Sequence, residues 1–173
     1  MELWEAIRGR RSVRSFQDRP MERELLERLV EAAMWAPSGG NAQTWQFVVV
    51  TEPDRVRRIR VVSPGLLGDP PAVIAVCQDL REAEAKGGRL GREFLAVVDA
   101  AMAAQNVLLA AHDAGLGTCV IASFHREAVA RLLELPEGIE PILLISVGWP
   151  KEVPPPPRRR ADVLHYEVYG GQA

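Results

Sequence analysis

The stretch "DAAMAAQNVLLAAHDAGLGTCVIASF", residues 99–124, joins a long apolar helix pattern to a glycine-rich turn and a strand. Over residues 94–111 the predicted helix is apolar around most of its circumference. The polar exceptions recur at heptad spacing and form one narrow stripe: Asp99, Asn106 and Asp113. A helix that is apolar nearly all round is buried on more than one side. Two explanations remain open: a single chain buries it centrally, or its far face packs on a second subunit.

Helix and strand patterns alternate along the rest of the chain. Helices are predicted over residues 2–10, 22–36, 53–62, 92–114 and 125–134, and strands over residues 45–51, 70–77, 116–122 and 140–149. The charged, glycine-containing segment 80–91 is predicted to be the most mobile. The Pro-rich "PKEVPPPPRRR" (150–160) is predicted to be an extended arm, and residues 161–170 are a candidate further strand. The pattern indicates an α/β or α+β layered domain.

Composition bounds the class of protein. With 173 residues, 47% of them hydrophobic, we expect one globular domain over residues 1–173. A net charge of −2 gives no argument for nucleic acid or an anionic membrane as partner. There is no signal-peptide pattern and no run of 18 apolar residues, so no membrane span is predicted. Cys77 and Cys119 have neither disulfide-framework nor metal-site spacing, which favours a reducing cytoplasm.

Two basic clusters are candidate phosphate sites. In "RGRRSVRSF" (8–16), three arginines flank Ser12 where a helix ends, and a guanidinium offers a planar donor fork suited to phosphate. In "PPPPRRR" (154–160), a Pro-stiffened segment carries three more arginines. The alternative for each is a solvated basic loop or tail. Two such clusters in one small acidic protein favour a bound phosphate.

Two glycine-rich stretches are candidate ligand loops. "APSGGNAQTWQF" (36–47) links a helix to a strand with glycines that allow close backbone approach, polar side chains and two aromatics that could wall a ligand, Trp45 and Phe47. The alternative is an irregular turn after a helix stop. "GLGTCVIAS" (115–123) is a glycine-rich entry into a strand, for which a helix cap and a turn are the simpler explanation. The three histidines are scattered, and no metal or nucleophile motif occurs.

Read together with "DPPAVIAVC", "LLELPEGIEPILLISVGWP" and "RRRADVLHYEVYG", these stretches resemble the nitroreductase family of flavoproteins, from about residue 3 to residue 169. The resemblance implies an α+β fold with a central, mostly antiparallel sheet flanked by helices. It also implies a homodimer built on the long central helix, with the C-terminal arm exchanged with the partner and two FMN sites at the interface.

Site residues follow from the resemblance by position. The phosphate, ribityl chain and ring edge of FMN would be contacted by Arg10, Arg11, Ser12 and Arg14. The phosphate cradle would be completed by Arg158 and Arg160, with Arg159 as an alternative. The partner subunit would supply Pro37, Ser38, Gly39 and Asn41 against the isoalloxazine. Backbone amides near the reactive ring nitrogen would come from Ile121, Ala122 and Ser123, although Val120 and Ala122 depart from the Trp and Gly of many short relatives.

The activity implied is a ping-pong transfer of electrons from NADH or NADPH through FMN to a nitroaromatic, a quinone or a similar electron-poor acceptor. No catalytic side chain and no metal are predicted. Two alternatives stay open. One is a flavoprotein of the same fold with other chemistry, such as dehalogenation, dehydrogenation or flavin fragmentation. The other is a flavin-binding protein without catalysis.

Overall fold

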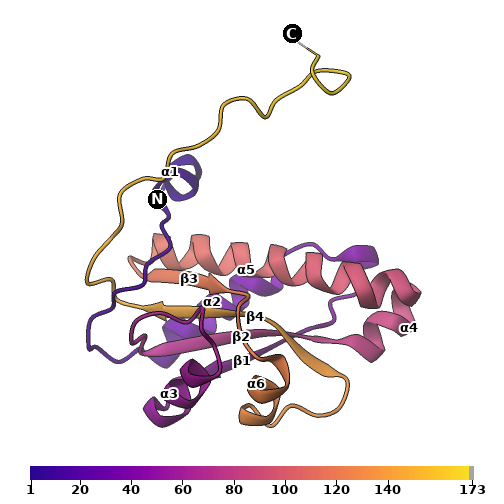
Figure 1. Cartoon of the computed structure of the whole chain (residues 1–173). Coiled ribbons are helices and arrows are strands. Elements are labelled where there is room, and N and C mark those ends of the chain that lie inside the picture. Colours follow the sequence, from indigo (N-terminus) through magenta and orange to yellow (C-terminus); the bar gives the residue numbers. More distant parts are fainter. Residues whose placement is uncertain (172–173) are drawn as a thin grey trace.

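A four-stranded sheet organises the chain, of which a computed structural model describes residues 1–171 (Figure 1). Its strands are β1 (Trp45–Val50), β2 (Ala72–Asp79), β3 (Gly117–Ile121) and β4 (Ile139–Gly148), in the order β1-β2-β4-β3. All three pairings are antiparallel, and Ile74 of β2 lies opposite Val49 of β1 and Ile145 of β4. The α+β class and the antiparallel sheet are therefore confirmed.

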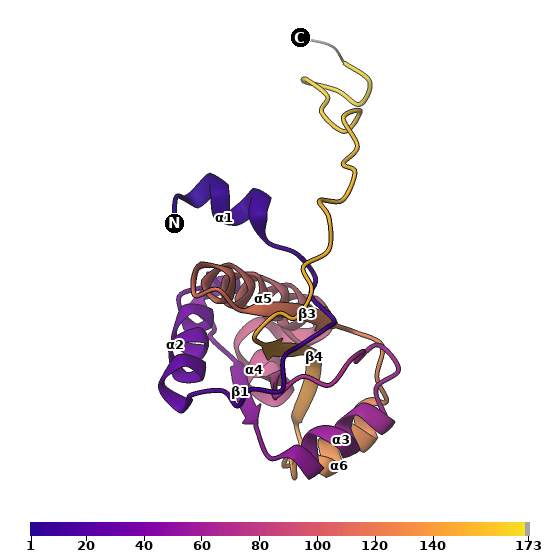
Figure 2. The same cartoon turned by 90° about the vertical axis from the view of Figure 1, so that its left-hand side faces the viewer.

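Helices cover both faces of this sheet. α2 (Arg23–Met34) and α5 (Ala96–Asp113) lie on one face, and α3 (Pro53–Val61) and α6 (Arg126–Leu132) lie on the other (Figures 1 and 2). Because successive side chains of a strand point to opposite faces, β2 serves both cores. Ala72, Ile74 and Val76 pack on the α2 and α5 side, and Val73, Ala75 and Cys77 pack on the other.

The two ends of the chain stand apart from the sheet. α1 (Leu3–Gly9) touches the body mainly through α5, and Leu3 and Trp4 are 65% and 67% exposed. The arm from Lys151 onward is extended, and Figure 2 shows it leaving the body on the side of α5 where α1 lies. Residues 161–170 form turns and bends there, so the candidate further strand is absent from this part of the chain.

The expectation of a mobile segment at 80–91 missed a helix. Residues Leu80–Leu90 form α4, which leads into a π-helical turn, η2 (Gly91–Leu95). The side chain of Asp79 accepts hydrogen bonds from the first backbone N–H groups, and Lys86 pairs with Glu82 one turn earlier at 2.7 Å. Leu80 and Ala83 are buried. Capping and two buried positions outweigh the glycines and the high charge.

The polar stripe of α5 faces inward at Asp99 and Asn106, whereas Asp113 at the end of the helix is exposed. Asp99 is only 2% exposed, and the Nδ2 atom of Asn106 donates to the carbonyl of Ala32 in α2 at 3.0 Å. The exposed side carries both apolar and polar residues, with Val97 at 44% and Gln105 also exposed. The helical stretch Leu80–Asp113 is long enough to cross a membrane and contains an 18-residue window with a mean hydropathy of 1.7. A core helix meets the same criterion, and α5 packs on α2 and on all four strands.

The two edges of the sheet differ. Along β3, Ser12 forms a parallel bridge with Thr118, so the N-terminal segment partly covers that edge. Along β1, no described segment pairs with the outer edge. One row of backbone hydrogen-bonding groups therefore remains open at β1.

Candidate functional site

The segment "RRSVR" (10–14) is fixed against the edge strand β3. Besides the bridge of Ser12 to Thr118, the backbone N–H of Val13 donates to the carbonyl of Thr118 at 2.9 Å. Val13 is 3% exposed and packs where Gly117 has no side chain, because a Cβ there would lie 2.7 Å from Val13. Gly117, the second glycine of "GLGTC", therefore makes room for the basic segment. This role goes beyond the simple turn that the sequence suggested.

The arginines of this segment have different surroundings. The Nη1 atom of Arg11 donates to the carbonyls of Arg8, Gly9 and Arg10 at 2.6, 2.9 and 2.9 Å, so Arg11 caps the C-terminal end of α1. Arg14 makes one long bond, from Nη1 to the carbonyl of Ser12 at 3.4 Å. Within residues 1–171, neither Arg10 nor Arg14 forms an ion pair.

The field beside the segment is positive. His112, near the end of α5, lies against Gly9, where a Cβ would come within 2.6 Å of its Nε2 atom. The pKa of His112 is lowered, first by burial and then by the positive charges of Arg11 and Arg10. Besides burial, the lowered pKa reflects the positive charge that Arg10 and Arg11 place beside this end of α5.

A loop between α3 and β2, which was not predicted from the sequence, connects the end of β3 to the basic segment. The backbone N–H of Gly65 donates to the carbonyl of Ser123 at 3.0 Å, and a Cβ on Gly65 would lie 2.8 Å from Ile121. Gly68, with φ +75°, lies against the carbonyl of Arg14. The loop thus joins residues 121–123 to the basic segment, and two glycines in "SPGLLGDPP" were its only sequence signal.

The stretch Pro37–Asn41 forms a strained loop. It contains a 3₁₀ turn, η1 (Gly39–Asn41), and φ is positive at Gly40 (57°), Asn41 (55°) and Gln43 (51°). Positive φ is uncommon for residues with a side chain. Internal bonds support it: Ser38 Oγ accepts from the backbone of Gln43 at 3.1 Å, and Asn41 Oδ1 accepts from Gln43 Nε2 at 2.8 Å. Strain of this kind gathers at functional sites.

Two anchors outside the loop hold its ends. The backbone N–H of Gly39 donates to both carboxylate oxygens of Asp99, at 3.1 and 3.2 Å. At the other end, Lys86 Nζ donates to the carbonyl of Ala42 at 2.7 Å. Neither anchor was predicted, because both reach the loop from α4 and α5, far along the sequence.

The two halves of the predicted site are separated within one chain. The loop lies at the Asp99 end of α5, and the basic segment lies at the His112 end. These residues are about 20 Å apart along the helix at 1.5 Å per residue. One chain therefore brings residues 10–14 together with 121–123, and does not bring either together with residues 37–41.

The C-terminal arginines also stand apart. Arg158, Arg159 and Arg160 are exposed on the extended arm, and Arg160 pairs with Asp162 at 2.9 Å. No hydrogen bond in the described chain joins them to residues 10–14. Trp45 is 7% exposed within the core on the α5 side, and Phe47 packs beside the same core and lines a hollow of about 560 Å³ between α2 and β1.

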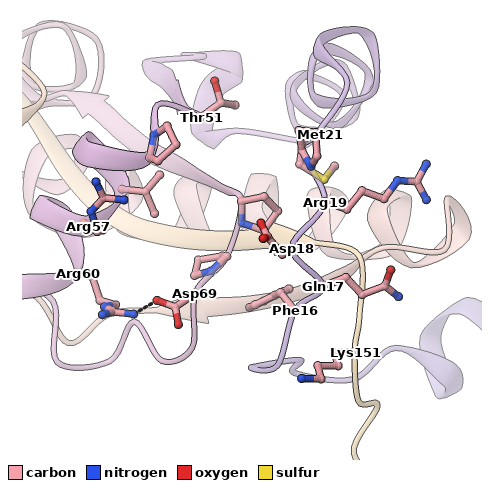
Figure 3. A pocket seen from close by; sticks show the side chains of 15 residues that line it. Phe16, Gln17, Asp18, Arg19, Met21, Thr51, Arg57, Arg60, Asp69 and Lys151 are labelled. Atoms are coloured by element: carbon pink, nitrogen blue, oxygen red, sulfur yellow. Dashed lines mark hydrogen bonds and ion pairs between the residues drawn. The ribbon is translucent and has the colours of Figure 1, made fainter.

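A large hollow lies elsewhere on the molecule. It measures about 940 Å³ and is lined by residues 16–21, Thr51 and the start of α3, residues 69–71 and Lys151. Figure 3 shows Arg57, Arg60 and Asp69 on one side of it and Arg19, Gln17 and Lys151 on the other. Arg60 is paired with Asp69, and Arg19 lies over the ring of Trp149 at 3.8 Å. None of the predicted site residues lines this hollow.

The chain is similar in sequence and in fold to known proteins. The profile of the Nitroreductase family matches residues 7–63 and 60–149. The chain is 35% identical to a protein of Methanothermobacter thermautotrophicus, provisionally named an NADH dehydrogenase/NAD(P)H nitroreductase, over 89% of this chain and 80% of that one. It is 31% identical to the FMN reductase (NADPH) of Bacillus subtilis, over 84% of this chain and 65% of that one. A crystal structure from Parabacteroides distasonis, with a provisional name of the same kind, is 31% identical with a TM-score of 0.83, covering 95% of this chain and 97% of that one.

Proposed function

Because this chain belongs to the nitroreductase family, we propose that it is an FMN-dependent oxidoreductase that takes electrons from NADH or NADPH. Its acceptors are nitroaromatics, quinones or similar electron-poor small molecules. The relatives named as an NAD(P)H nitroreductase and an FMN reductase support this reaction class. The observation that carries the proposal is the basic segment fixed against β3, where Arg10 and Arg14 have no carboxylate partner in residues 1–171.

The residues at this edge fit FMN by their chemistry. The guanidinium groups of Arg10 and Arg14 and the hydroxyl of Ser12 would hold the phosphate and the ribityl chain. Backbone groups of residues 121–123 would lie along the reactive edge of the ring. Arg11 would act mainly through the end of α1, because its guanidinium already caps three carbonyls.

A homodimer would complete the site. The loop residues Pro37, Ser38, Gly39 and Asn41 would face the flavin bound by the other subunit, because about 20 Å of helix separates them from their own basic segment. In a two-fold dimer, residues from opposite ends of α5 can meet across the interface. The exposed apolar side chains of α1 and the extended arm support such an assembly, in which Arg158, Arg159 or Arg160 would reach the phosphate.

FMN supplies the redox chemistry when it is bound. The chain's own groups bind the phosphate, orient the ring between two subunits and leave room for nicotinamide and acceptor in turn, which is the ping-pong order. The predicted site residues include no carboxylate, histidine or cysteine. Solvent is therefore the proposed proton source, and the proposed location of the enzyme is the cytoplasm.

An anaerobic titration tests this function. The purified protein, loaded with FMN, is mixed with NADH or NADPH while the visible absorbance of the flavin is followed. We expect rapid bleaching that a nitroaromatic or a quinone reverses. Bleaching by dithionite alone would contradict the proposed electron donor and favour another chemistry on the same fold. A protein that retains no FMN at micromolar concentration would contradict the flavin site itself.

A further inference from the structure

A buried carboxylate lies under the strained loop. Asp99 is 2% exposed, and its only hydrogen-bond donor in the described chain is the backbone N–H of Gly39. No cation within residues 1–171 pairs with it. Burial raises the pKa of Asp99, and the bond from Gly39 offsets part of that rise.

A buried carboxylate without a cationic partner lowers the stability of the fold, so stability does not explain its presence. An ionised group in the interior is costly unless a partner of opposite charge compensates it. The neighbours of Asp99 include Leu95, Ala96 and a cavity of about 20 Å³ that it shares with Gly39 and Thr44. A neutral or apolar side chain would avoid the cost of burying charge there. The carboxylate therefore points to a role in holding the loop.

The loop needs external support. Gly40, Asn41 and Gln43 all adopt positive φ, which the surroundings must enforce. Asp99 fixes one end through Gly39, whose missing side chain leaves room for Leu95, since a Cβ would lie 2.8 Å from Leu95 Cδ1. Lys86 fixes the other end through Ala42. Of the residues predicted to face the partner's flavin, Gly39 and Asn41 lie within this anchored segment, and Pro37 and Ser38 directly precede it.

We propose that Asp99 is a positioning residue, whose carboxylate holds the Gly39 N–H so that Ser38, Gly39 and Asn41 present a fixed wall to the flavin of the partner subunit. The inference rests on the proposed function for its consequence in the loaded enzyme. The hydrogen bond between Gly39 and Asp99 is present without flavin, so it can be tested in flavin-free protein.

The first experiment uses flavin-free protein. Asp99→Ala removes the acceptor, and Asp99→Asn keeps one oxygen in the same place. Asp113→Asn is the matched control, because Asp113 lies on the same helix with a side chain 56% exposed and pairs only with the N-terminus. Two measurements report on the rigidity of the loop: hydrogen exchange of the peptide spanning residues 36–44, and the chemical shift of the Gly39 amide proton.

We expect Asp99→Ala to raise exchange of the loop about 10- to 100-fold, the equilibrium equivalent of one hydrogen bond to a charged acceptor. Asp99→Asn should restore most of the protection, and Asp113→Asn should match the wild type. Equal exchange in Asp99→Ala and wild type would overturn the proposal. So would a rise in exchange spread evenly over the whole chain, because that indicates general destabilisation.

The second experiment uses the FMN-loaded dimer. Val129→Ala is the control for stability, because Val129 is fully buried in α6 on the opposite face of the sheet. At saturating FMN, Asp99→Ala should change the visible circular dichroism of the flavin and lower kcat severalfold, with recovery in Asp99→Asn. Val129→Ala should change neither.

The outcomes of the two experiments are separable. If the wild type binds FMN and turns over while Asp99→Ala behaves like Val129→Ala, the positioning role fails and the proposed function stands. If the wild type binds no FMN, the proposed function fails. The exchange data then still decide whether Asp99 holds the loop.

Discussion

Asp99 and His112 mark opposite ends of α5, and they lie against Gly39 of the predicted loop and Gly9 beside the predicted basic segment. Asp99 accepts a hydrogen bond from Gly39, and His112 packs on Gly9. The helix between them separates the loop from the basic segment by about 20 Å. In the proposed dimer, a flavin held by the segment of one chain would therefore meet the loop of the other, and this geometry leads to the first prediction.

Mixed dimers should recover activity that neither parent has. Arg14→Ala and Asn41→Ala each place a defect in both sites of their own homodimer. In a heterodimer the two defects fall in the same site, and the other site is wild type. Random mixing gives half heterodimers, so about a quarter of all sites should recover by symmetry. Co-expression with two affinity tags and a turnover assay checks this. Activity that stays at parental level, with heterodimers present, would contradict a shared site.

FMN affinity should depend on Arg14. A hydrogen bond to a charged group contributes about 1.5–3 kcal/mol, so Arg14→Ala should weaken FMN binding about 10- to 100-fold. Arg28→Ala is the control, since Arg28 is exposed on α2 and outside the predicted site. Fluorescence titration measures both, and mass spectrometry of the released cofactor identifies it. Release of FAD, or unchanged FMN affinity in Arg14→Ala, would remove Arg14 from the site.

Gly117 should be intolerant of a methyl group. A Cβ there would lie 2.7 Å from Val13, so Gly117→Ala must displace the basic segment from β3. Overpacking of this kind costs about 1–3 kcal/mol, and FMN affinity should fall with it. Gly87→Ala in α4 is the matched control, because nothing lies within 4 Å of its Cβ and Ala favours a helix. Thermal unfolding and FMN titration test the pair. A Gly117→Ala protein as stable as Gly87→Ala would refute the close contact.

The stability difference between Asp99→Asn and wild type should depend on pH. Because burial raises the pKa of Asp99 in the folded state, the folded chain binds more protons than the unfolded chain between that pKa and the ordinary value of about 3.9. The wild type therefore loses unfolding free energy as pH rises through this window, and the variant does not. Thermal unfolding of flavin-free protein at pH 4.5 and pH 7 should show the variant gaining relative to wild type at the higher pH. A difference that is constant with pH, or that shrinks as pH rises, would disprove this linkage.

The sequence predicted every strand and all but one of the main helices, because side-chain periodicity is a local signal. It failed at α4, where capping by Asp79 and the Lys86 pair decide a segment whose composition suggests a loop. It could not order the strands, because pairing joins residues far apart, such as Ile74 and Ile145. The family resemblance supplied the antiparallel arrangement that periodicity had left open.

The candidate site divides in the same way. The segment 10–14 and the stretch 37–41 are visible as clusters of unusual residues, so the sequence marks them. Their supports are single residues in other elements: Gly65 and Gly68 under β3, Lys86 in α4 and Asp99 in α5. Asp99 was predicted only as part of a polar stripe, and only packing shows that Asp99 and Asn106 face inward. Trp45 was read as a ligand wall and is a core residue.

The open edge of β1 has a consequence for how the protein reaches its native state. An unpaired strand edge invites pairing with any other extended chain, and Val49 beside it is 39% exposed. A folded chain therefore exposes an edge that can pair with other chains, and a high concentration of such chains during refolding favours aggregation. Yield on refolding should then fall as the chain concentration rises, and slow dilution should favour recovery of the native form.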